Sequence, residues 1–286
     1  MKYNSSLHTK SLLIKGLLGK AESFVSNISK NRNDVIILNY HGTQKPFLAN
    51  FEWQIEFLLK HFDPITPMEF EKIIETSQKL KIKKPKFLLT FDDGILNNLN
   101  IINLLKKHSL EAYFFIIPEF VDAIEPKAFF IENIRPIINP NIDNNKEDFA
   151  PLTWTDITEL IKQGHTIGAH TSSHAMTKET SGERLEYEIV KAKQILEDKL
   201  NIPIKTFCSI NNTLESVSTK AALKIKENYQ FHFTTIAGKN IPFLPFSIKR
   251  INVESHWNND AFKYAIGKWE QKRWKNKVLE VNQLMK

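Results

Sequence analysis

The chain has 286 residues, 42% of them hydrophobic, and a formal net charge of +7 from 39 basic and 32 acidic residues. This is enough apolar material for a large core, and a barrel of this length commonly forms one domain. No repeat of 20–50 residues is present, which argues against a solenoid or a propeller. Nothing resembles a nucleic-acid-binding module. The single cysteine, Cys208, excludes an internal disulfide and is compatible with a reducing compartment.

Residues 1–33 form a separate N-terminal segment in which apolar and charged residues are mixed. Its apolar positions recur at the spacing of one helix face: Leu13, Leu17, Ala21, Phe24 and Ile28. Lys15, Lys20 and Glu22 interrupt the apolar run, so it resembles neither a membrane span nor a secretory signal. We expect an amphipathic helix that packs on the domain or rests on a membrane surface. This predicts a cytoplasmic protein, with peripheral contact at the inner membrane face as an option.

Short apolar runs alternate with helical patterns over residues 34–257. The predicted strands are 35–40, 86–91, 112–117, 165–169 and 204–210, and the predicted helices are 95–108, 153–163 and 183–200. This alternation indicates an α/β fold with parallel strands. Residues 118–151 interrupt the alternation as a long insertion. Because long loops in compact domains are often functional, we expect this one to border a substrate groove.

Two adjacent carboxylates, Asp92 and Asp93, follow the apolar run Phe87–Phe91 and precede Gly94. They therefore lie at the carboxyl end of a strand, where α/β folds usually place their sites. Neighbouring side chains diverge at a strand end, so one acid can bind a metal while the other faces a reacting water. A simple turn with helix-capping acids is the alternative, since Asp and Gly favour turns.

Two imidazoles, His170 and His174, follow another short strand. Their spacing lets both rings reach one ion if the segment makes a helical turn. One Asp and two His with an open coordination position are typical of a hydrolytic zinc site.

The two motifs, Thr90–Gly94 (TFDDG) and His170–His174 (HTSSH), resemble those of polysaccharide deacetylases with a NodB-homology domain, carbohydrate esterase family 4. The approach to the second motif, Leu152–Ala169, is also similar, and similarity extends from about Val35 to Val253. The resemblance implies a deformed (β/α) barrel of seven strands. It also implies hydrolysis of an N-acetyl group on a sugar.

The resemblance assigns roles to the motif residues. Asp93, His170 and His174 would hold one divalent metal, and Asp92 would be the general base that takes a proton from the attacking water. Zinc suits this ligand set best, and nickel, cobalt or iron would also fit.

The third family motif, an Arg-Pro-Pro-Tyr-Gly or Phe-Ala-Tyr-Pro-x-Gly run, is altered here to Phe207–Asn212 (FCSINN). We expect Asn212 to replace the glycine in a left-handed turn. In the family, a backbone N–H of this loop helps to bind the oxyanion, and Asn211 is the matching candidate for substrate binding.

The late family histidine has no clean match. Instead, Ser247–Val253 resembles the Arg-Ile-Pro-Val element of the branch that acts on poly-N-acetylglucosamine, and Val35–Gly42 resembles its first strand, which ends in Tyr-His. His41 is therefore the expected general acid for the leaving amine, with a purely structural histidine as the alternative. Arg250 is expected to bind a substrate oxygen or to anchor Asp92, and an ordinary surface ion pair remains open.

Residues 258–286 are predicted to form a basic C-terminal helix that contains two tryptophans. Its basic residues are Lys263, Lys268, Lys272, Arg273, Lys275 and Lys277. Such a segment could contact anionic lipid headgroups, although a solvated helix face is the more common explanation of a charge run.

The motifs and the family resemblance thus predict a metal-dependent enzyme that deacetylates an amino sugar in bacterial surface-polysaccharide biosynthesis. The substrate would be a glycan or a glycan precursor, with a nucleotide-linked or lipid-linked sugar as an option. A non-catalytic descendant that binds a glycan or a partner protein is the alternative. Hydrolysis of another acyl group by the same residues also stays open.

Overall fold

The computed structural model describes residues 35–76, 84–135, 139, 142–267 and 273–286. Its sheet contains eight strands, all paired in parallel. Seven of them follow the order β7-β6-β5-β4-β3-β1-β8, and β2 lies beside β3. The bounds are β1 Val35–Tyr40, β2 Asp63–Pro64, β3 Lys86–Phe91, β4 Ala112–Ile116, β5 Thr166–Ala169, β6 Thr206–Cys208, β7 Phe231–Phe233 and β8 Ile251–Asn252. The predicted parallel α/β fold is confirmed.

One segment joins the two ends of this path. Residues around β8 pair with β1, where Leu38 faces Ile251, and also form a parallel bridge between Ile248 and Phe233 of β7. The sheet therefore curls into a deformed barrel, as predicted. The same segment carries Arg250 between its two pairing regions, so barrel closure brings this residue to the carboxyl end of β3.

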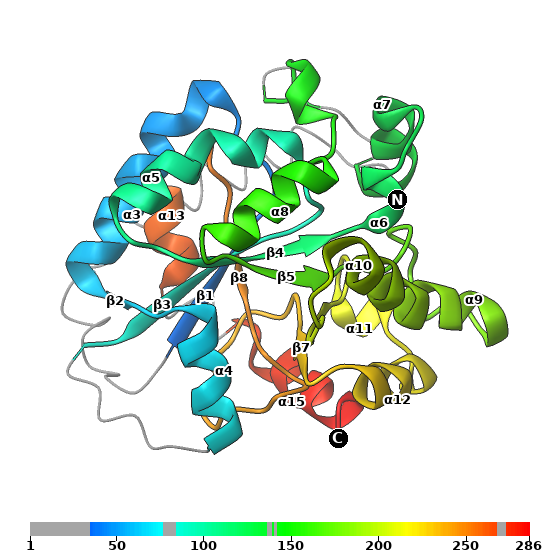
Figure 1. Ribbon diagram of the computed structural model, residues 1–286. Coiled ribbons are helices and arrows are strands. Elements are labelled where there is room, and N and C mark those ends of the chain that lie inside the picture. The colour runs from blue at the N-terminus through cyan, green and yellow to red at the C-terminus, as the bar shows by residue number, and fades with distance from the viewer. Residues whose placement is uncertain (1–34, 77–83, 136–138, 140–141, 268–272) are drawn as a thin grey trace.

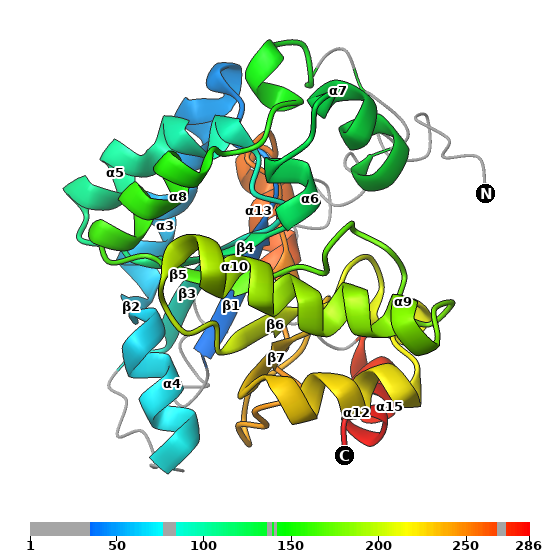
Figure 2. The same ribbon diagram turned by 45° about the vertical axis from the view of Figure 1, so that its right-hand side comes forward.

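Helices cover the outside of the curled sheet (Figures 1 and 2), except for α4 Pro67–Thr76, which packs through Phe70 against the inner face of the strands. The other longer ones are α3 Leu48–His61, α8 Trp154–Lys162, α10 Ala192–Leu200, α12 Thr219–Asn228, α13 Asn259–Ile266 and α15 Lys275–Leu284. Two predicted helices have irregular parts. The helix predicted at 95–108 starts as the 3₁₀ helix η2 Leu96–Ile101 before α5 Ile102–Lys107, and the one at 183–200 comprises α9 Gly182–Glu186, the π-helical turn η5 Tyr187–Lys191 and α10.

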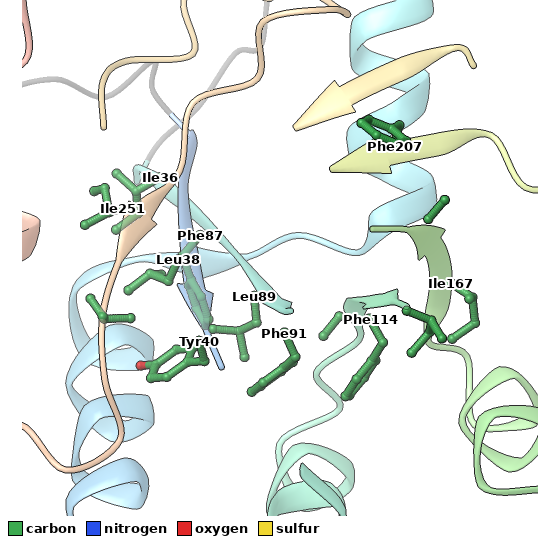
Figure 3. Packing of buried hydrophobic residues seen from close by; sticks show 14 of the residues in the cluster. Ile36, Leu38, Tyr40, Phe87, Leu89, Phe91, Phe114, Ile167, Phe207 and Ile251 are labelled. Carbon is green, nitrogen blue, oxygen red and sulfur yellow. The ribbon is translucent and has the colours of Figure 1, made fainter. Parts of the chain in front are cut away.

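The strands are buried on both faces, because side chains alternate between the outer helix layer and the barrel interior. Figure 3 shows the outer layer, in which Leu38, Leu89 and Phe114 pack together. Their sequence neighbours Ile37 and Leu88 point to the opposite side, into the barrel interior, where they form a second cluster with Phe70 of α4. Each fully buried Leu or Phe stabilises the fold by about 2–3 kcal/mol relative to an exposed one. These strands hold the loops at their carboxyl ends in fixed positions.

The insertion at 118–151 is largely structured within the part described. It contains α6 Pro118–Val121, α7 Pro126–Phe129, the π-helical turn η3 Phe130–Ile134 and the 3₁₀ turn η4 Lys146–Asp148. Phe120, Phe130 and Phe149 pack into a small core of their own. This core fixes the end of η3 next to the sheet.

Of the two predicted terminal helices, the structure describes only the C-terminal one. The helix expected in residues 1–33 lies outside the described residues, and its boundary remains a prediction. The C-terminal segment is not one continuous helix, because α13 ends at the extended residue Gly267 and α15 starts at Lys275. Phe262 of α13 and Val281 of α15 are buried in the main core. No helix in the described ranges is long and apolar enough to cross a membrane.

Candidate metal centre and active site

The turn after β3 carries the two adjacent carboxylates. The backbone N–H of Asp92 donates to the carbonyl of Tyr40 at 2.9 Å, so Asp92 continues the strand pairing. Asp93 then adopts a left-handed conformation with φ of 73°, and Gly94 follows with φ of 70°. This conformation costs a non-glycine residue about 1–2 kcal/mol. It turns the Asp93 side chain away from that of Asp92, so the two buried acids face different partners.

The turn after β5 carries the two histidines. It is irregular and is not the helical turn that we considered as a way to bring both rings to one ion, because Thr171 and His174 both adopt left-handed conformations with φ of 60° and 63°. The fully buried Glu188 stabilises this turn, since its carboxylate accepts from the backbone N–H groups of Ser172 at 3.1 Å and Ser173 at 3.0 Å. The π-helical turn η5 places Glu188 on the side that faces the histidine turn.

Asp93, His170 and His174 converge on one point. Nε2 of His170 and Nε2 of His174 lie 3.4 and 3.5 Å from Oδ1 of Asp93. The potential ligand atoms all lie within 4.8 Å of one another, and all three residues are buried. Oδ1 of Asp93 has no hydrogen-bond partner within the part of the chain that the structure describes. A buried carboxylate oxygen without a partner is costly, which a cation at this point would relieve.

The outer nitrogens of both rings support the same conclusion. Nδ1 of His170 lies 3.0 Å from the carbonyl of Cys208, and Nδ1 of His174 lies 2.7 Å from the carbonyl of Asn133. A carbonyl can only accept, so each Nδ1 carries a proton, and in the neutral form of each ring Nε2 directs its lone pair toward Asp93. Burial lowers the pKa of His174, which favours a neutral ring. The pKa of His170 is raised instead, because its burial is outweighed by the neighbouring Cys208 and Asp92, so a cation bound here would displace the Nε2 proton of that ring. One carboxylate and two neutral imidazoles are suitable ligands for a divalent transition metal.

A second group of possible ligands, Asp92, His170 and Cys208, overlaps this one. It fits a metal less well, because both carboxylate oxygens of Asp92 already accept hydrogen bonds from Arg250. Nη2 of Arg250 also donates to Sγ of Cys208 at 2.8 Å. The geometry therefore favours the group around Asp93.

Arg250 is the anchor of Asp92. Nη1 and Nη2 donate to Oδ1 and Oδ2 of Asp92 at 2.7 and 2.8 Å, and neither residue is more than 1% exposed. The alternative that Arg250 forms an ordinary ion pair at the surface is therefore wrong, because the pair is buried. The remaining donors reach acceptors within the protein, namely the Thr234 carbonyl, Asn39, Thr90 and Cys208. A guanidinium has five N–H donors, and this set leaves none for a substrate oxygen.

The charges in the site keep both carboxylates ionised. Burial alone would raise the pKa of Asp92, but the Arg250 guanidinium outweighs it and lowers that pKa. Burial acts in the same direction on Asp93, but the neighbouring imidazoles of His170, His41 and His174 hold its pKa well below the usual range. Asp92 is thus ionised at neutral pH and able to accept a proton, and its hydrogen bonds with Arg250 fix the orientation of the carboxylate.

His41 lies across the pocket from the metal ligands, after β1. Its ring is 28% exposed, and Nδ1 lies 4.0 Å from Oε1 of Glu254. The sequence analysis missed Glu254, which follows β8 in a loop and carries no local signal. The pair resembles a histidine oriented by a carboxylate, an arrangement suited to proton transfer.

The altered loop after β6 also reaches the pocket. Asn211 is exposed, lines the pocket and has the left-handed conformation, with φ of 46°. The expectation that Asn212 takes this conformation is wrong, since its φ is −83° and its side chain instead caps α11 Thr213–Ser216. Asn favours both places because its short amide bonds to nearby backbone groups.

All predicted site residues line one pocket of about 390 Å³: His41, Asp92, Asp93, His170, His174, Asn211 and Arg250. Other lining residues carry no local signal in the sequence, among them Arg135 of the insertion, Glu254 and Trp274. Arg135 confirms that the insertion borders the pocket.

Comparisons with known proteins agree with this geometry. A family model described as polysaccharide deacetylase matches residues 79–226. A peptidoglycan-N-acetylglucosamine deacetylase of Bacillus cereus is 26% identical over 118 residues, which cover 41% of this chain and 42% of that protein. The match thus spans less than half of the curated relative. The structure of IcaB from Ammonifex degensii has a TM-score of 0.61 at 18% identity, covering 84% of this chain and 97% of that one. A polysaccharide deacetylase from Bacillus cereus, BC0361, has a TM-score of 0.58 at 22% identity, with 82% and 69% covered.

Proposed function

Because the chain belongs to the polysaccharide deacetylase family, we propose that it is a metal-dependent hydrolase that removes the N-acetyl group from an amino sugar. The observation that carries this proposal is the convergence of Asp93, His170 and His174 around one unpartnered carboxylate oxygen. A divalent cation held there would supply Lewis acidity, which polarises the acetyl carbonyl and makes water more nucleophilic at neutral pH. Zinc is the metal that this ligand set favours most.

Asp92 acts as the general base in this proposal. It is charged at neutral pH, and Arg250 fixes its orientation beside the metal ligands. It takes a proton from the water that attacks the acetyl carbon. Arg250 is a positioning residue, because its donors are all used within the protein.

His41 and the loop after β6 act on the other side of the acetyl group. His41 gives a proton to the leaving amine nitrogen, and Glu254 orients its ring. The backbone N–H of Asn211 donates to the carbonyl oxygen as negative charge develops on it. Backbone donors can keep this function when side chains in a loop change.

The substrate belongs, in our proposal, to the assembly of a bacterial surface polysaccharide, as a glycan or as a nucleotide-linked or lipid-linked precursor. We place this enzyme, as part of the proposal, in the cytoplasm with peripheral contact at the inner membrane face. A non-catalytic glycan-binding protein is the competing proposal, which the altered loop after β6 favours. The buried Asp92–Arg250 pair favours the enzyme, because a binding protein has no need for an oriented carboxylate beside a metal site.

Acetate release tests the proposal directly. The metal-loaded protein is incubated with N-acetylglucosamine oligomers, UDP-N-acetylglucosamine and a lipid-linked N-acetylglucosamine, with Asp92→Asn as the matched control. We expect release from at least one substrate and a loss of about 100-fold or more in the control. Formylated and O-acetylated sugars run beside them distinguish the acyl group. No release from any substrate by protein with one bound metal would support the glycan-binding protein instead.

A further inference from the structure

Two pocket residues come from segments outside the barrel strands. Arg135 follows η3 in the insertion, and Trp274 lies directly before α15. Both line the pocket that contains Asp93, His41 and the other site residues. Neither has a place in the hydrolytic steps described above, so their presence in the pocket wall requires another explanation.

Arg135 is held rigidly at the pocket. Its Nη1 donates to both oxygens of Asp143, at 2.9 and 2.8 Å, and Asp143 is only 3% exposed. Gln44 donates to the same carboxylate at 3.1 Å, and Ser255 donates to the Gln44 side chain at 3.2 Å. These contacts join the insertion to the loops after β1 and β8. A side chain positioned in this way loses little entropy when it binds a ligand.

The charge around Arg135 indicates the kind of ligand. Burial would lower its pKa, but Glu254, Asp143 and Asp93 together raise it. The Asp143 carboxylate already balances the guanidinium in a direct ion pair, so Arg135 brings hydrogen-bond donors to the pocket without an unpaired positive charge that would favour a phosphate. The guanidinium still has more N–H donors than Asp143 uses, and its side chain is 30% exposed. Uncharged acceptors such as sugar hydroxyl oxygens fit these conditions.

Trp274 provides an apolar surface for the same ligand. The side chain is half-buried and packs against the main core, and the ammonium of Lys277 lies 4.7 Å from its ring centroid. The adjoining helix α15, red in Figure 1, packs against α11, which follows the Asn211 loop. Ligand pockets typically combine such an aromatic surface with a few fixed polar groups.

We propose that Arg135 and Trp274 bind the sugar ring of the substrate, Arg135 through hydrogen bonds to uncharged hydroxyl oxygens and Trp274 through contact with an apolar ring face. They are specificity residues and take no part in proton transfer. The proposal rests on the proposed function only for the assumption that the ligand is a sugar. It assigns the C-terminal segment a place in the substrate site.

The test measures binding without turnover. Metal-loaded Asp92→Asn protein is titrated with a neutral N-acetylglucosamine pentamer, and with UDP-N-acetylglucosamine as the charged probe. Arg135→Gln and Trp274→Ala, each in this background, should raise the Kd of the pentamer about fivefold or more, which is the loss expected for one good contact. Trp274→Phe should keep most of the affinity. Trp53→Phe, in a cluster with Phe57 and Phe262, is the control for removal of a tryptophan elsewhere.

The outcomes separate this proposal from the proposed function. Equal pentamer affinity in all variants overturns it, as does a pentamer that does not bind the Asp92→Asn protein. An effect of Arg135→Gln confined to UDP-N-acetylglucosamine also overturns it, because it indicates a phosphate contact. If the wild-type protein releases no acetate but pentamer binding needs both side chains, the proposed function fails and the sugar-binding pair stands. Metal affinity and melting temperature are measured for each variant and should equal those of the Asp92→Asn protein. If a change in either quantity accounts for the loss of pentamer binding, the proposal is also overturned.

Discussion

The guanidinium of Arg250 donates hydrogen bonds to both oxygens of the Asp92 carboxylate, at 2.7 and 2.8 Å, and both residues are buried. The two residues are 158 positions apart in the sequence and meet because the segment around β8 closes the barrel. This contact decides the protonation state and the orientation of the proposed base. A bidentate pair of this kind adds geometric precision as well as energy.

Removal of Arg250 should affect stability and the pH profile together. Arg250→Met leaves Asp92 as an uncompensated buried charge, which should cost about 3–5 kcal/mol of unfolding free energy. Because Arg250 lowers the pKa of Asp92, the acidic limb of kcat/KM should move to higher pH in this variant. Urea unfolding and a pH–rate profile measure the two effects.

The double variant Arg250→Met/Asp92→Asn is the control for this prediction. It should regain much of the stability, since neither charge of the buried pair remains, but none of the activity. Equal stability of Arg250→Met and the wild-type protein would contradict the account of this pair.

Glu188 should matter for metal binding although it lies outside the pocket. Its carboxylate accepts from the Ser172 and Ser173 backbone and from the Ser173 hydroxyl at 2.7 Å, and so fixes the turn between the two histidines. Glu188→Gln should weaken metal affinity about 10–100-fold, the usual loss for a residue that orients ligands. Chelator competition measures it. Glu186→Gln, on the exposed side of the same helical run, should bind metal like the wild type.

Glu254 should influence turnover more than substrate affinity. Its Oε1 lies 4.0 Å from Nδ1 of His41, which has no hydrogen-bond partner among the described residues. Glu254→Gln keeps the shape but removes the negative charge that orients the His41 ring. We expect kcat to fall about tenfold with KM nearly unchanged. An unchanged kcat would exclude the proposed pairing with His41.

Acid should destabilise the protein through two buried histidines. Burial lowers the pKa of His165 and of His232 to about 4, from a usual value of 6.5. Between pH 6.5 and 4 the unfolded chain binds these protons and the folded protein does not, so stability falls with falling pH. At pH 4 the loss is about 3 kcal/mol for each ring.

His165→Asn tests this prediction. Its amide oxygen can still accept from the Ala112 N–H, which donates to Nδ1 of His165 at 3.2 Å. The difference in unfolding free energy between pH 7 and pH 4 should shrink by roughly the contribution of one ring. An unchanged difference would show that His165 titrates normally in the folded protein.

The metal half of the site could be predicted because its signals are local. Asp92 and Asp93 end an apolar strand, and His170 and His174 follow another, so strand alternation alone brings both turns to one edge of the sheet. The shape of the histidine turn could not be predicted. It depends on left-handed residues and on Glu188, which lies in the π-helical turn η5 and contacts the histidine turn from another part of the chain.

The other half of the pocket depends on contacts that span most of the chain. Whether Arg250 anchors Asp92 or binds substrate follows from how its segment closes the barrel, which no local pattern encodes. Arg135, Glu254 and Trp274 come from loops and a helix start, where hydrophobic periodicity gives no information. The left-handed residue of the altered loop was placed one position too late for the same reason, since either asparagine suits that conformation.

The most direct test of the central claim is acetate release during removal and return of the metal. The chelated protein should release no acetate from the substrate identified in the panel, and one equivalent of zinc should restore the rate. His174→Ala should bind zinc weakly and recover little activity at the same concentration. Full turnover by the chelated protein, or by metal-loaded His174→Ala, would contradict the assignment of Asp93, His170 and His174 as the metal ligands of a hydrolase.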